Sequence, residues 1–270
     1  MSASKVQPIL TAENVTMRFG GVTAVSDLSL KVDEGSIVGV IGPNGAGKTT
    51  LFNVLSGFYT PQEGDVRFAG KSIRGRKPFE ICRMGMARTF QNIRLSPHMS
   101  VLENVMVGCH VRRRCPWWMA PLGLPMYYKE EKAITDKARD LVEHLNLAEY
   151  MDEKAGSLPY GAQRRLEIAR ALASSPQIIL FDEPTSALDP EMIGEVLQVM
   201  KTLAHSGITM LVVTHEMQFA REIADRVVFI DGGDILEVAP PAEFFAHPQH
   251  ARARRFLQKV LDPLHQESLE

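Results

Sequence analysis

The sequence predicts an α/β protein with a mostly parallel sheet, a smaller antiparallel β part and an inserted helical part. Residues 36–41 form a short, continuous apolar run, which is typical of a parallel strand covered on both faces. A glycine-rich loop and an apolar-periodic segment follow this run directly. Further along, short apolar runs alternate with helical patterns after residue 177, and alternation of this kind predicts a parallel sheet with helices on both faces.

The first third of the chain is rich in predicted strands. Residues 9–19 and 25–32 alternate or run apolar, residues 36–41 are the buried run, and residues 51–56 have helical periodicity. Between Gly57 and Gly75, turn-forming residues surround the short segment 65–68, Asp-Val-Arg-Phe, which indicates a return to short antiparallel strands. These segments predict the antiparallel β subdomain.

The middle and last parts supply helices and the remaining parallel strands. A helical pattern extends from about Val101 to Leu172, with one break rich in Pro, Trp and Met between Cys115 and Pro125. Strands are then expected at 178–181, 208–213 and 226–230, with helices at 192–204 and 219–224. We expect one domain over residues 8–245, a helical subdomain inserted at about 92–172, and a helical tail over 246–270.

Composition excludes several classes of protein. The chain has 270 residues, of which 45% are hydrophobic and 23% charged, values typical of a globular protein. Thirty Lys and Arg against 32 Asp and Glu give a net charge of -2, so no global positive field attracts nucleic acid or anionic lipid. Three cysteines without a CxxC pair argue against a disulfide framework and a zinc site, and favour a reducing cytosol. No signal peptide and no run of about 18 apolar residues is recognised, so we expect a membrane role only through partners.

The loop after the buried run carries the pattern G-x-x-x-x-G-K-[ST]. Glycines allow the backbone to wrap around phosphates, which the amide N–H groups and the helix N-terminus attract. Lys48 would reach the β- and γ-phosphates, and the Thr49 hydroxyl would bind magnesium. The alternative, a fortuitous glycine turn, is disfavoured because a strand precedes the loop and a helix follows it. The predicted nucleotide-binding residues here are Gly42, Pro43, Asn44, Gly45, Ala46, Gly47, Lys48, Thr49 and Thr50.

A pair of carboxylates ends the apolar run 178–181. Adjacent side chains at a strand end point in different directions, so Asp182 could bind magnesium while Glu183 acts on the attacking water. Taken alone, such a pair is commonly a solvated acidic strand end. The phosphate-binding pattern upstream favours the functional interpretation.

Taken in order, these motifs resemble the ATP-binding subunit of an ABC transporter, and the resemblance covers about residues 8 to 260. The motifs are the phosphate loop, Gln91, the segment 158–163, Asp182 with Glu183, the segment 186–189, and His215. A GTPase or small-molecule kinase is disfavoured, because the chain lacks an Asn-Lys-x-Asp motif. In the ABC transporter family, two ATP-binding subunits are arranged head to tail, and ATP and Mg²⁺ bind between them.

The resemblance implies a role for each matching residue. Phe19 would stack on adenine, Gln91 would contact magnesium and couple it and the water to the membrane partner, and His215 would hold the γ-phosphate. Gly161 would face the nucleotide of the opposite subunit, and Asp189 would cross the dimer. Taken singly, Phe19 would be a core residue, Gln91 a surface amide and His215 an ordinary histidine, and only the ordered set favours the functional roles.

Different segments of the sequence resemble two different subgroups of the family. The family segment usually reads Leu-Ser-Gly-Gly-Gln, whereas Pro159, Tyr160 and Ala162 depart from it here. This variant, with the segments 163–170 and 87–95, resembles branched-chain amino-acid importer subunits. The segments 185–190, 214–221 and 244–257 look more like polar amino-acid importer subunits.

The resemblance implies an ATPase that energises amino-acid import, most of all of branched-chain amino acids, at the cytoplasmic face of the membrane. Its expected partners are membrane permeases, a second ATPase subunit and, indirectly, an extracytoplasmic binding protein, but not nucleic acid. The alternatives are a polar amino-acid importer and a soluble ABC ATPase without a permease. Residues 112–118, with three arginines and two tryptophans, could bind headgroups, protein or nucleic acid, or form a solvated loop.

Overall fold

The structure is a computed structural model that describes residues 8–113, 115 and 125–261. The chain divides into two compact units. The first unit combines the chain up to Pro78 with the chain from Ala204 onward, and the second unit is Phe79–Leu203. The domain boundaries predicted from the sequence, 8–245 with an insertion at about 92–172 and a tail over 246–270, remain predictions.

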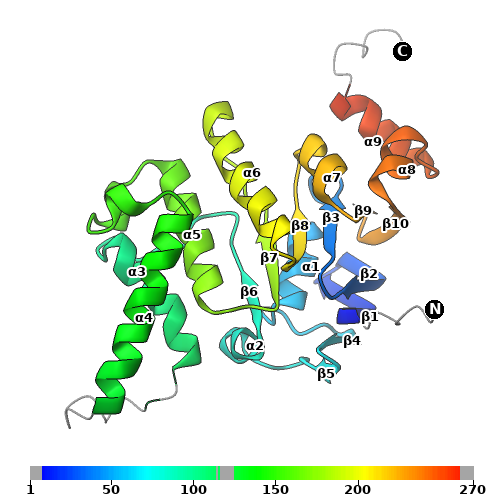
Figure 1. The fold of residues 1–270 in the computed structure, drawn as a ribbon. Coiled ribbons are helices and arrows are strands. Elements are labelled where there is room, and N and C mark those ends of the chain that lie inside the picture. Colours follow the sequence, from blue (N-terminus) through cyan, green and yellow to red (C-terminus); the bar gives the residue numbers. More distant parts are fainter. Residues whose placement is uncertain (1–7, 114, 116–124, 262–270) are drawn as a thin grey trace, which may run out of the picture. The chain divides into compact units, whose positions relative to one another are not determined.

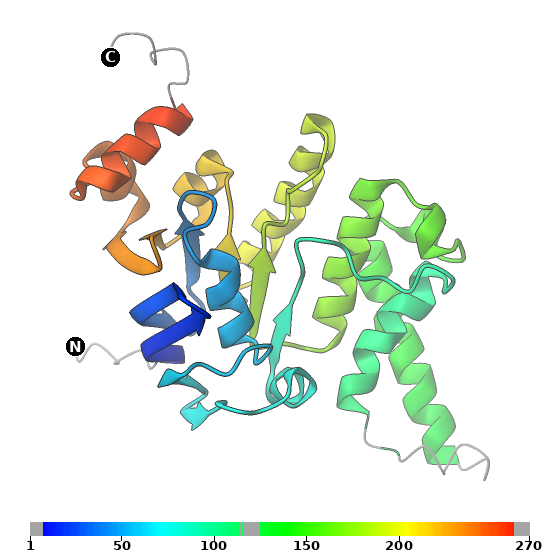
Figure 2. The same ribbon diagram turned by 180° about the vertical axis from the view of Figure 1, so that it is seen from behind.

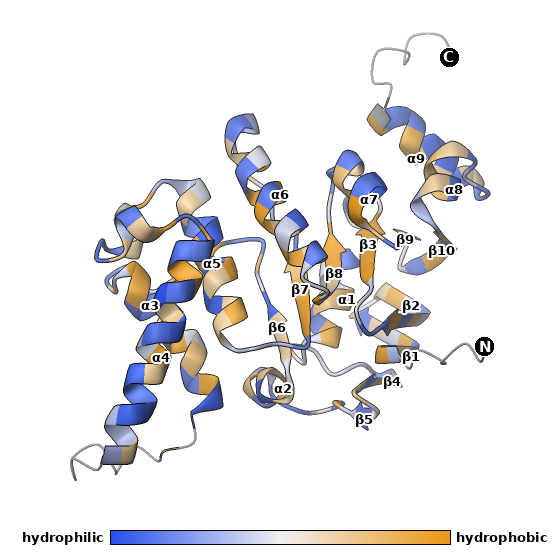
Figure 3. Cartoon of the chain, viewed as in Figure 1, coloured by the Kyte–Doolittle hydropathy of each residue, from blue (hydrophilic) through white to orange (hydrophobic). Residues whose placement is uncertain are grey.

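Parallel strands form the centre of the first unit. Strand β3 (Ile37–Ile41) pairs in parallel with β8 (Thr209–Val213) and with β9 (Arg226–Asp231). All residues of β3 and β8 are buried, as expected for strands covered on both faces, and both strands are strongly hydrophobic (Figure 3). The three strands predicted from the sequence are therefore confirmed. Strand β10 (Asp234–Ala239), which the sequence analysis missed, runs antiparallel to β9 after the turn at Gly232 and Gly233.

An antiparallel sheet accompanies these strands, as predicted. Its order is β2-β1-β4-β5, and its strands are β1 (Pro8–Phe19), β2 (Val22–Asp33), β4 (Glu63–Phe68) and β5 (Lys71–Ser72). Gly64 at the start of β4 has φ of +83°, and a Cβ there would overlap the carbonyl oxygens of Glu13 and Asn14. Close pairing of β1 with β4 therefore requires glycine at this position.

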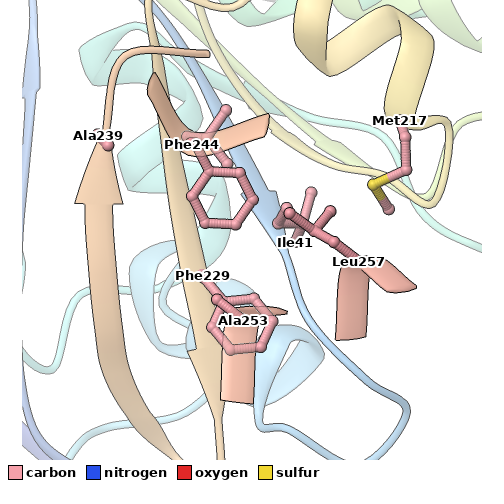
Figure 4. Close-up of a cluster of buried hydrophobic side chains, with 8 residues drawn as sticks. Ile41, Met217, Phe229, Ala239, Phe244, Ala253 and Leu257 are labelled. Carbon is pink, nitrogen blue, oxygen red and sulfur yellow. The ribbon is translucent and has the colours of Figure 1, made fainter. Parts of the chain in front are cut away.

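The helices of the first unit are α1 (Lys48–Leu55), α7 (Met217–Ile223), α8 (Pro241–Ala246) and α9 (Ala251–Leu261). The last two helices belong to the core of this unit. Phe244 of α8 and Leu257 of α9 are buried in one cluster with Phe229 of β9 and Ile41 of β3 (Figure 4). Phe256 also lies 5.4 Å from Phe229, measured between ring centroids. Helices α8 and α9 thus pack against the end of the strand that leads into the phosphate loop.

The second unit consists mainly of helices. Helices α3 (Val101–Cys109), α4 (Pro125–His144) and α5 (Tyr160–Ala173) lie side by side (Figures 1 and 2). Gly108 allows α3 to approach α5, because a Cβ there would overlap the carbonyl oxygen of Arg170. The helical pattern over 101–172 is confirmed, whereas most of its break, including Arg114 and the two tryptophans of the segment 112–118, lies outside the described residues.

Two strands and further helices complete this unit. Strands β6 (Met86–Arg88) and β7 (Ile178–Asp182) pair in parallel. The remaining elements are α2 (Pro78–Met84), α6 (Pro190–His205) and the 3-10 helices His110–Arg112, Ala148–Tyr150 and Ala155–Ser157. The strand at 178–181 and the helix at 192–204 were predicted, but α2 and β6 were not. In the described part of the chain, no helix combines the length and the apolar character needed to cross a membrane.

Candidate functional site

The glycine-rich loop connects β3 to α1. Gly47 has φ of +98° and precedes the first residue of α1. A Cβ on Gly47 would overlap the carbonyl oxygen of Ala24, and a Cβ on Gly42 would overlap that of Ile230. The amide of Gly233 donates a 3.1 Å hydrogen bond to the carbonyl of Ala46 and so anchors the loop to the β9–β10 turn. The path of the loop therefore requires the two glycines that the motif places at its ends.

Positive charge and N–H groups converge at this loop. Lys48 is only 5% exposed, and its Nζ donates hydrogen bonds of 2.8 Å to the carbonyls of Gly42 and Pro43. The first turn of the described helix α1 contains no acidic side chain, and its first N–H groups have no intrahelical acceptor. Thr49 is exposed at this end of the helix. A helix N-terminus that begins with a lysine is suited to binding phosphate groups.

His215 lies at the same edge of the parallel strands. Val40 of β3 is paired with Val213 of β8, and the amide of Thr214 donates a 3.3 Å hydrogen bond to the carbonyl of Val40. The exposed His215 therefore follows β8 at the edge from which the phosphate loop leaves β3. The structure thus brings the loop and His215 to one edge of the sheet.

Phe19 ends strand β1 in the same unit, and 43% of its surface is exposed. Its ring packs edge-on against Tyr59 at 5.3 Å between centroids. An exposed aromatic pair is suited to stacking on a planar ring. The sequence analysis missed Tyr59, because no spacing connects it with Phe19, 40 residues earlier.

In the second unit, Asp182 ends β7 and is held by an arginine. Arg88 Nη2 lies 2.6 Å from Asp182 Oδ2, and the side chains are 6% and 2% exposed. Arg88 ends strand β6, which is paired with β7, so strand pairing brings the two side chains together. Sequence analysis identified Asp182 but missed Arg88, which lies 94 residues earlier.

Glu183 lies just beyond this strand and contacts Gln91. It adopts a left-handed backbone conformation with φ of +46°, an uncommon one for a residue with a Cβ. The Gln91 Nε2 donates a 2.9 Å hydrogen bond to Glu183 Oε2. The structure therefore joins two residues that the sequence analysis assigned to catalysis on separate grounds.

A buried ion pair holds the backbone of Gln91. Arg164 is fully buried on α5 and lies 2.7 Å from Glu167. Arg164 also donates hydrogen bonds to the carbonyls of Phe90, at 2.6 Å, and of Gln91, at 2.8 Å. Burial raises the pKa of the Glu167 carboxyl, and the charge of Arg164 opposes this rise. Sequence analysis assigned neither residue a role. Their spacing of three residues indicates contact along a helix, but is equally typical of a surface pair.

Gly161 and Asp189 approach each other through Met192. Gly161 is buried in the first turn of α5, where a Cβ would lie 3.2–3.3 Å from the side chain of Met192. Met192 in turn donates its amide hydrogen to the carbonyl of Asp189 at 2.9 Å. Asp189 is exposed just before α6. The structure therefore places the two residues predicted to act across a dimer near one another.

The candidate metal ligands are oxygen and amide groups. Asp182 offers a carboxylate and Thr49 a hydroxyl, and such hard oxygen donors fit Mg²⁺. Among the residues that the structure describes, no three His, Cys, Asp or Glu side chains cluster as a metal site. With nucleotides, Mg²⁺ is usually held by few protein groups and by phosphate oxygens. The set Thr49, Gln91 and Asp182 remains a prediction.

Comparison with known proteins decides the family. Residues 25–186 match the family described as ABC transporter. The chain belongs to the ABC transporter family. It is 44% identical to the glutamine transport ATP-binding protein GlnQ of Bacillus subtilis over 94% of this chain and 100% of that protein. It is 38% identical to the high-affinity branched-chain amino acid transport ATP-binding protein BraF of Pseudomonas aeruginosa, over 92% and 97%.

A solved structure confirms the predicted fold of this ABC cassette. MJ1267, an ATP-binding cassette of an ABC transporter in its ADP conformation, superposes with a TM-score of 0.77. That chain is 30% identical and is covered over 99% of its length by 92% of this chain. The chain is thus an α/β P-loop NTPase of the ABC type, and it is an ATP-binding ATPase, as its motifs predicted.

Proposed function

We propose that this cassette is the ATP-hydrolysing subunit of an amino-acid importer. The observation that carries the proposal is the phosphate loop, in which Lys48 and the N-terminus of α1 present positive charge at the edge that also carries His215. GlnQ and BraF, which match nearly the whole chain, are both named for amino-acid transport. Because both names refer to amino acids, they support amino acids as the class of transported molecule.

Each site residue has a proposed role in ATP hydrolysis. Residues 42–50 bind the phosphates, and Phe19 stacks on adenine. Asp182 and Thr49 hold Mg²⁺, with Gln91 contacting it, and the bound ion would neutralise charge on the phosphates. Glu183 polarises the attacking water, because its carboxylate follows Asp182 in the chain and lies beside the side-chain amide of Gln91. His215 stabilises the γ-phosphate as it is transferred.

A second copy of the cassette, or a related subunit, is proposed to complete the cycle. Gly161 lies at the N-terminus of α5, where the helix dipole attracts an anion and no acidic side chain of the first turn opposes it. This end of α5 and Asp189 would then face the nucleotide of the partner. ATP would hold the two subunits together. Hydrolysis would then separate them and change the conformation of the permease.

For the cargo, we propose branched-chain amino acids. The two segments that resemble branched-chain importer subunits contact each other in the second unit, where Arg164 binds the backbone of Phe90 and Gln91. Two of the polar-type segments, 214–221 and 244–257, lie in the first unit, and the third, 185–190, lies in the second. If the second unit selects the permease, a branched-chain permease is favoured. The higher identity to GlnQ favours the alternative, a polar amino-acid importer.

The permease contact is proposed to lie on the second unit. A cavity of about 230 Å³ opens there between α2, β6, α3 and α5, and Val107 at its edge is 41% exposed. Its lining includes Cys82, Ala87, Arg88, Val107, Gly108, Val111, Glu167, Arg170, Ala171 and Ser174. A cavity next to the Gln91 segment that combines apolar with charged side chains suits an inserted amphipathic segment of a permease, through which the cassette would be held at the cytoplasmic face of the membrane.

Coexpression tests both the permease class and this contact. The cassette is coexpressed with branched-chain permeases and, separately, with polar amino-acid permeases, and the detergent-stable complexes are purified. We expect a complex with the branched-chain permeases. Val107→Glu should abolish this complex and leave ATPase activity intact. Val238→Glu, the same change at a 50% exposed position on β10, should leave both the complex and the ATPase activity intact.

Assembly with polar amino-acid permeases alone would overturn the branched-chain assignment. Assembly with neither class would favour a soluble ABC ATPase that acts without a permease.

A further inference from the structure

The backbone of Phe90 and Gln91 is held by side chains of α5 on three of its polar groups. Arg164 donates to both carbonyl oxygens, at 2.6 and 2.8 Å, and Glu167 Oε1 accepts a 3.2 Å hydrogen bond from the amide of Phe90. Arg164 Nη1 also binds Glu167 Oε2 at 2.7 Å. The two charged side chains therefore act as one group that clamps a two-residue segment.

The clamp is buried, and its geometry is specific. Arg164 is 0% exposed and Glu167 is 2% exposed, so neither side chain binds the segment through flexible, solvated contacts. A planar guanidinium offers donors in a fixed fork, which a lysine cannot reproduce. A buried ion pair is weak evidence for a role in stability alone, because hydrophobic residues of similar volume are often as stable. The arrangement is better explained by the exact placement of the segment it binds.

What the clamp places is the Gln91 side chain. Its Nε2 lies 2.9 Å from Glu183 Oε2, so a shift of the Gln91 backbone would carry the amide away from the carboxylate. Arg164 also follows Gly161 by one turn of α5, the helix whose N-terminus is proposed to face the partner's nucleotide. A continuous chain of contacts therefore leads from α5, through Arg164, to Gln91 and Glu183.

We propose that Arg164 and Glu167 are positioning residues for ATP hydrolysis, which set Gln91 against Glu183 and transmit the position of α5 to that carboxylate. The proposal rests on the roles of Glu183 and Gln91 given above. Arg164 touches neither nucleotide nor water in this scheme, and its effect passes through Gln91. It should therefore act on turnover and not on nucleotide binding.

A double-mutant cycle tests this dependence. Arg164→Lys keeps the charge but loses the forked donors, and it should lower kcat by about 10- to 100-fold, the cost of a small misplacement in an active site. KM and the affinity for a fluorescent ATP analogue should stay unchanged. In a Gln91→Ala background, measured with radiolabelled ATP, the same substitution should change kcat less than about twofold, because the group it positions is gone.

A neighbouring arginine supplies the matched control. Arg165 lies on the same helix and forms an ion pair with Glu195 rather than with the Gln91 segment. Arg165→Lys should leave kcat at the parental value. Thermal unfolding of each variant shows whether it is folded, and if Arg164→Lys does not fold, the near-isosteric Glu167→Gln takes its place in the cycle.

Three results would overturn the inference: equal falls in kcat with and without Gln91, an equal fall in Arg165→Lys, or parental kcat in a folded Arg164→Lys. Glu183→Gln separates these failures from failure of the proposed catalytic role. If it is inactive while Arg164→Lys is fully active, only the positioning role is wrong. If Glu183→Gln turns over at the parental rate, both are wrong.

Discussion

Arg88 binds Asp182 where β6 and β7 lie side by side, with 2.6 Å between Nη2 and Oδ2. Both side chains are almost fully buried, at 6% and 2% exposure. Arg88 is also 5.0 Å from the centre of the Phe90 ring, on whose face a guanidinium is attracted. One arginine therefore connects the proposed magnesium ligand with the segment that carries Gln91.

Replacing Arg88 by methionine should destabilise the protein markedly. The change leaves the buried carboxylate of Asp182 without this cation, and breaking a buried pair in this way costs about 3–5 kcal/mol. Urea unfolding measures the loss. The control is Arg18→Met, which removes the ion pair of Arg18 with Glu63. Because these two side chains are 49% and 58% exposed, the change should lower the free energy of unfolding by at most about 1 kcal/mol. Similar losses in the two variants would contradict the buried role of Arg88.

Glu183→Gln should preserve ATP binding and lower turnover by a factor on the order of 10² or more, as expected when a positioned base is removed. The amide keeps the shape of the side chain and its ability to accept the 2.9 Å hydrogen bond from Gln91. Phosphate release measures turnover, and sedimentation with ATP should show that the variant is held as a dimer. If the variant hydrolyses ATP at the parental rate, a residue other than Glu183 polarises the attacking water.

Lys48→Ala and His215→Ala should affect different steps, ATP binding in the first variant and phosphoryl transfer in the second. The buried Lys48 forms part of the phosphate loop, so its loss should weaken ATP binding and abolish turnover together. His215 is exposed at the edge of the sheet, and its loss should mainly lower kcat, because its contact is strongest during phosphoryl transfer. Isothermal titration with ATP and phosphate-release kinetics separate the two effects. Equal loss of ATP affinity in both variants would refute this division.

Gly161→Asp should abolish ATPase activity. It places a side chain against Met192 and a negative charge at the N-terminus of α5, which repels an anion there. Pro159→Ser is the mild comparison, because the hydrogen bond gained to a charged group is worth roughly 1.5–3 kcal/mol at most and the fixed backbone of proline is lost. Dimerisation with ATP in the Glu183→Gln background and phosphate release in the parental protein measure both variants. Near-parental activity of Gly161→Asp would mean that this segment does not face nucleotide.

Long, periodic or strongly apolar segments could be predicted from the sequence, and short ones could not. The runs that became β3, β7 and β8 are fully buried and continuous, so hydrophobicity alone identified them. Strand β6 has only three residues, too few for a pattern. Strand β10 was missed although Gly232 and Gly233 between two strand-like segments are a recognisable hairpin signal.

The candidate site shows the same division. Its motifs are local in sequence, and they led to residues 42–50, Asp182, Glu183 and His215. Arg88 and Arg164 were missed because their partners lie 94 and 73–74 residues away, and a single arginine gives no sign of such a distant contact. The left-handed backbone of Glu183 also has no sequence signal, because it departs from the preference of the residue that adopts it.

The burial of Ile41 with Phe244 and Leu257 has a consequence for the order in which the protein matures during synthesis. Strand β3 is made early, but its neighbours β8 and β9 and the helices that cover its end come from the last quarter of the chain. A nascent chain that stops before α9 leaves the apolar end of this strand uncovered. The ribosome must therefore release the chain as far as α9 before the end of β3 that leads into the phosphate loop is covered.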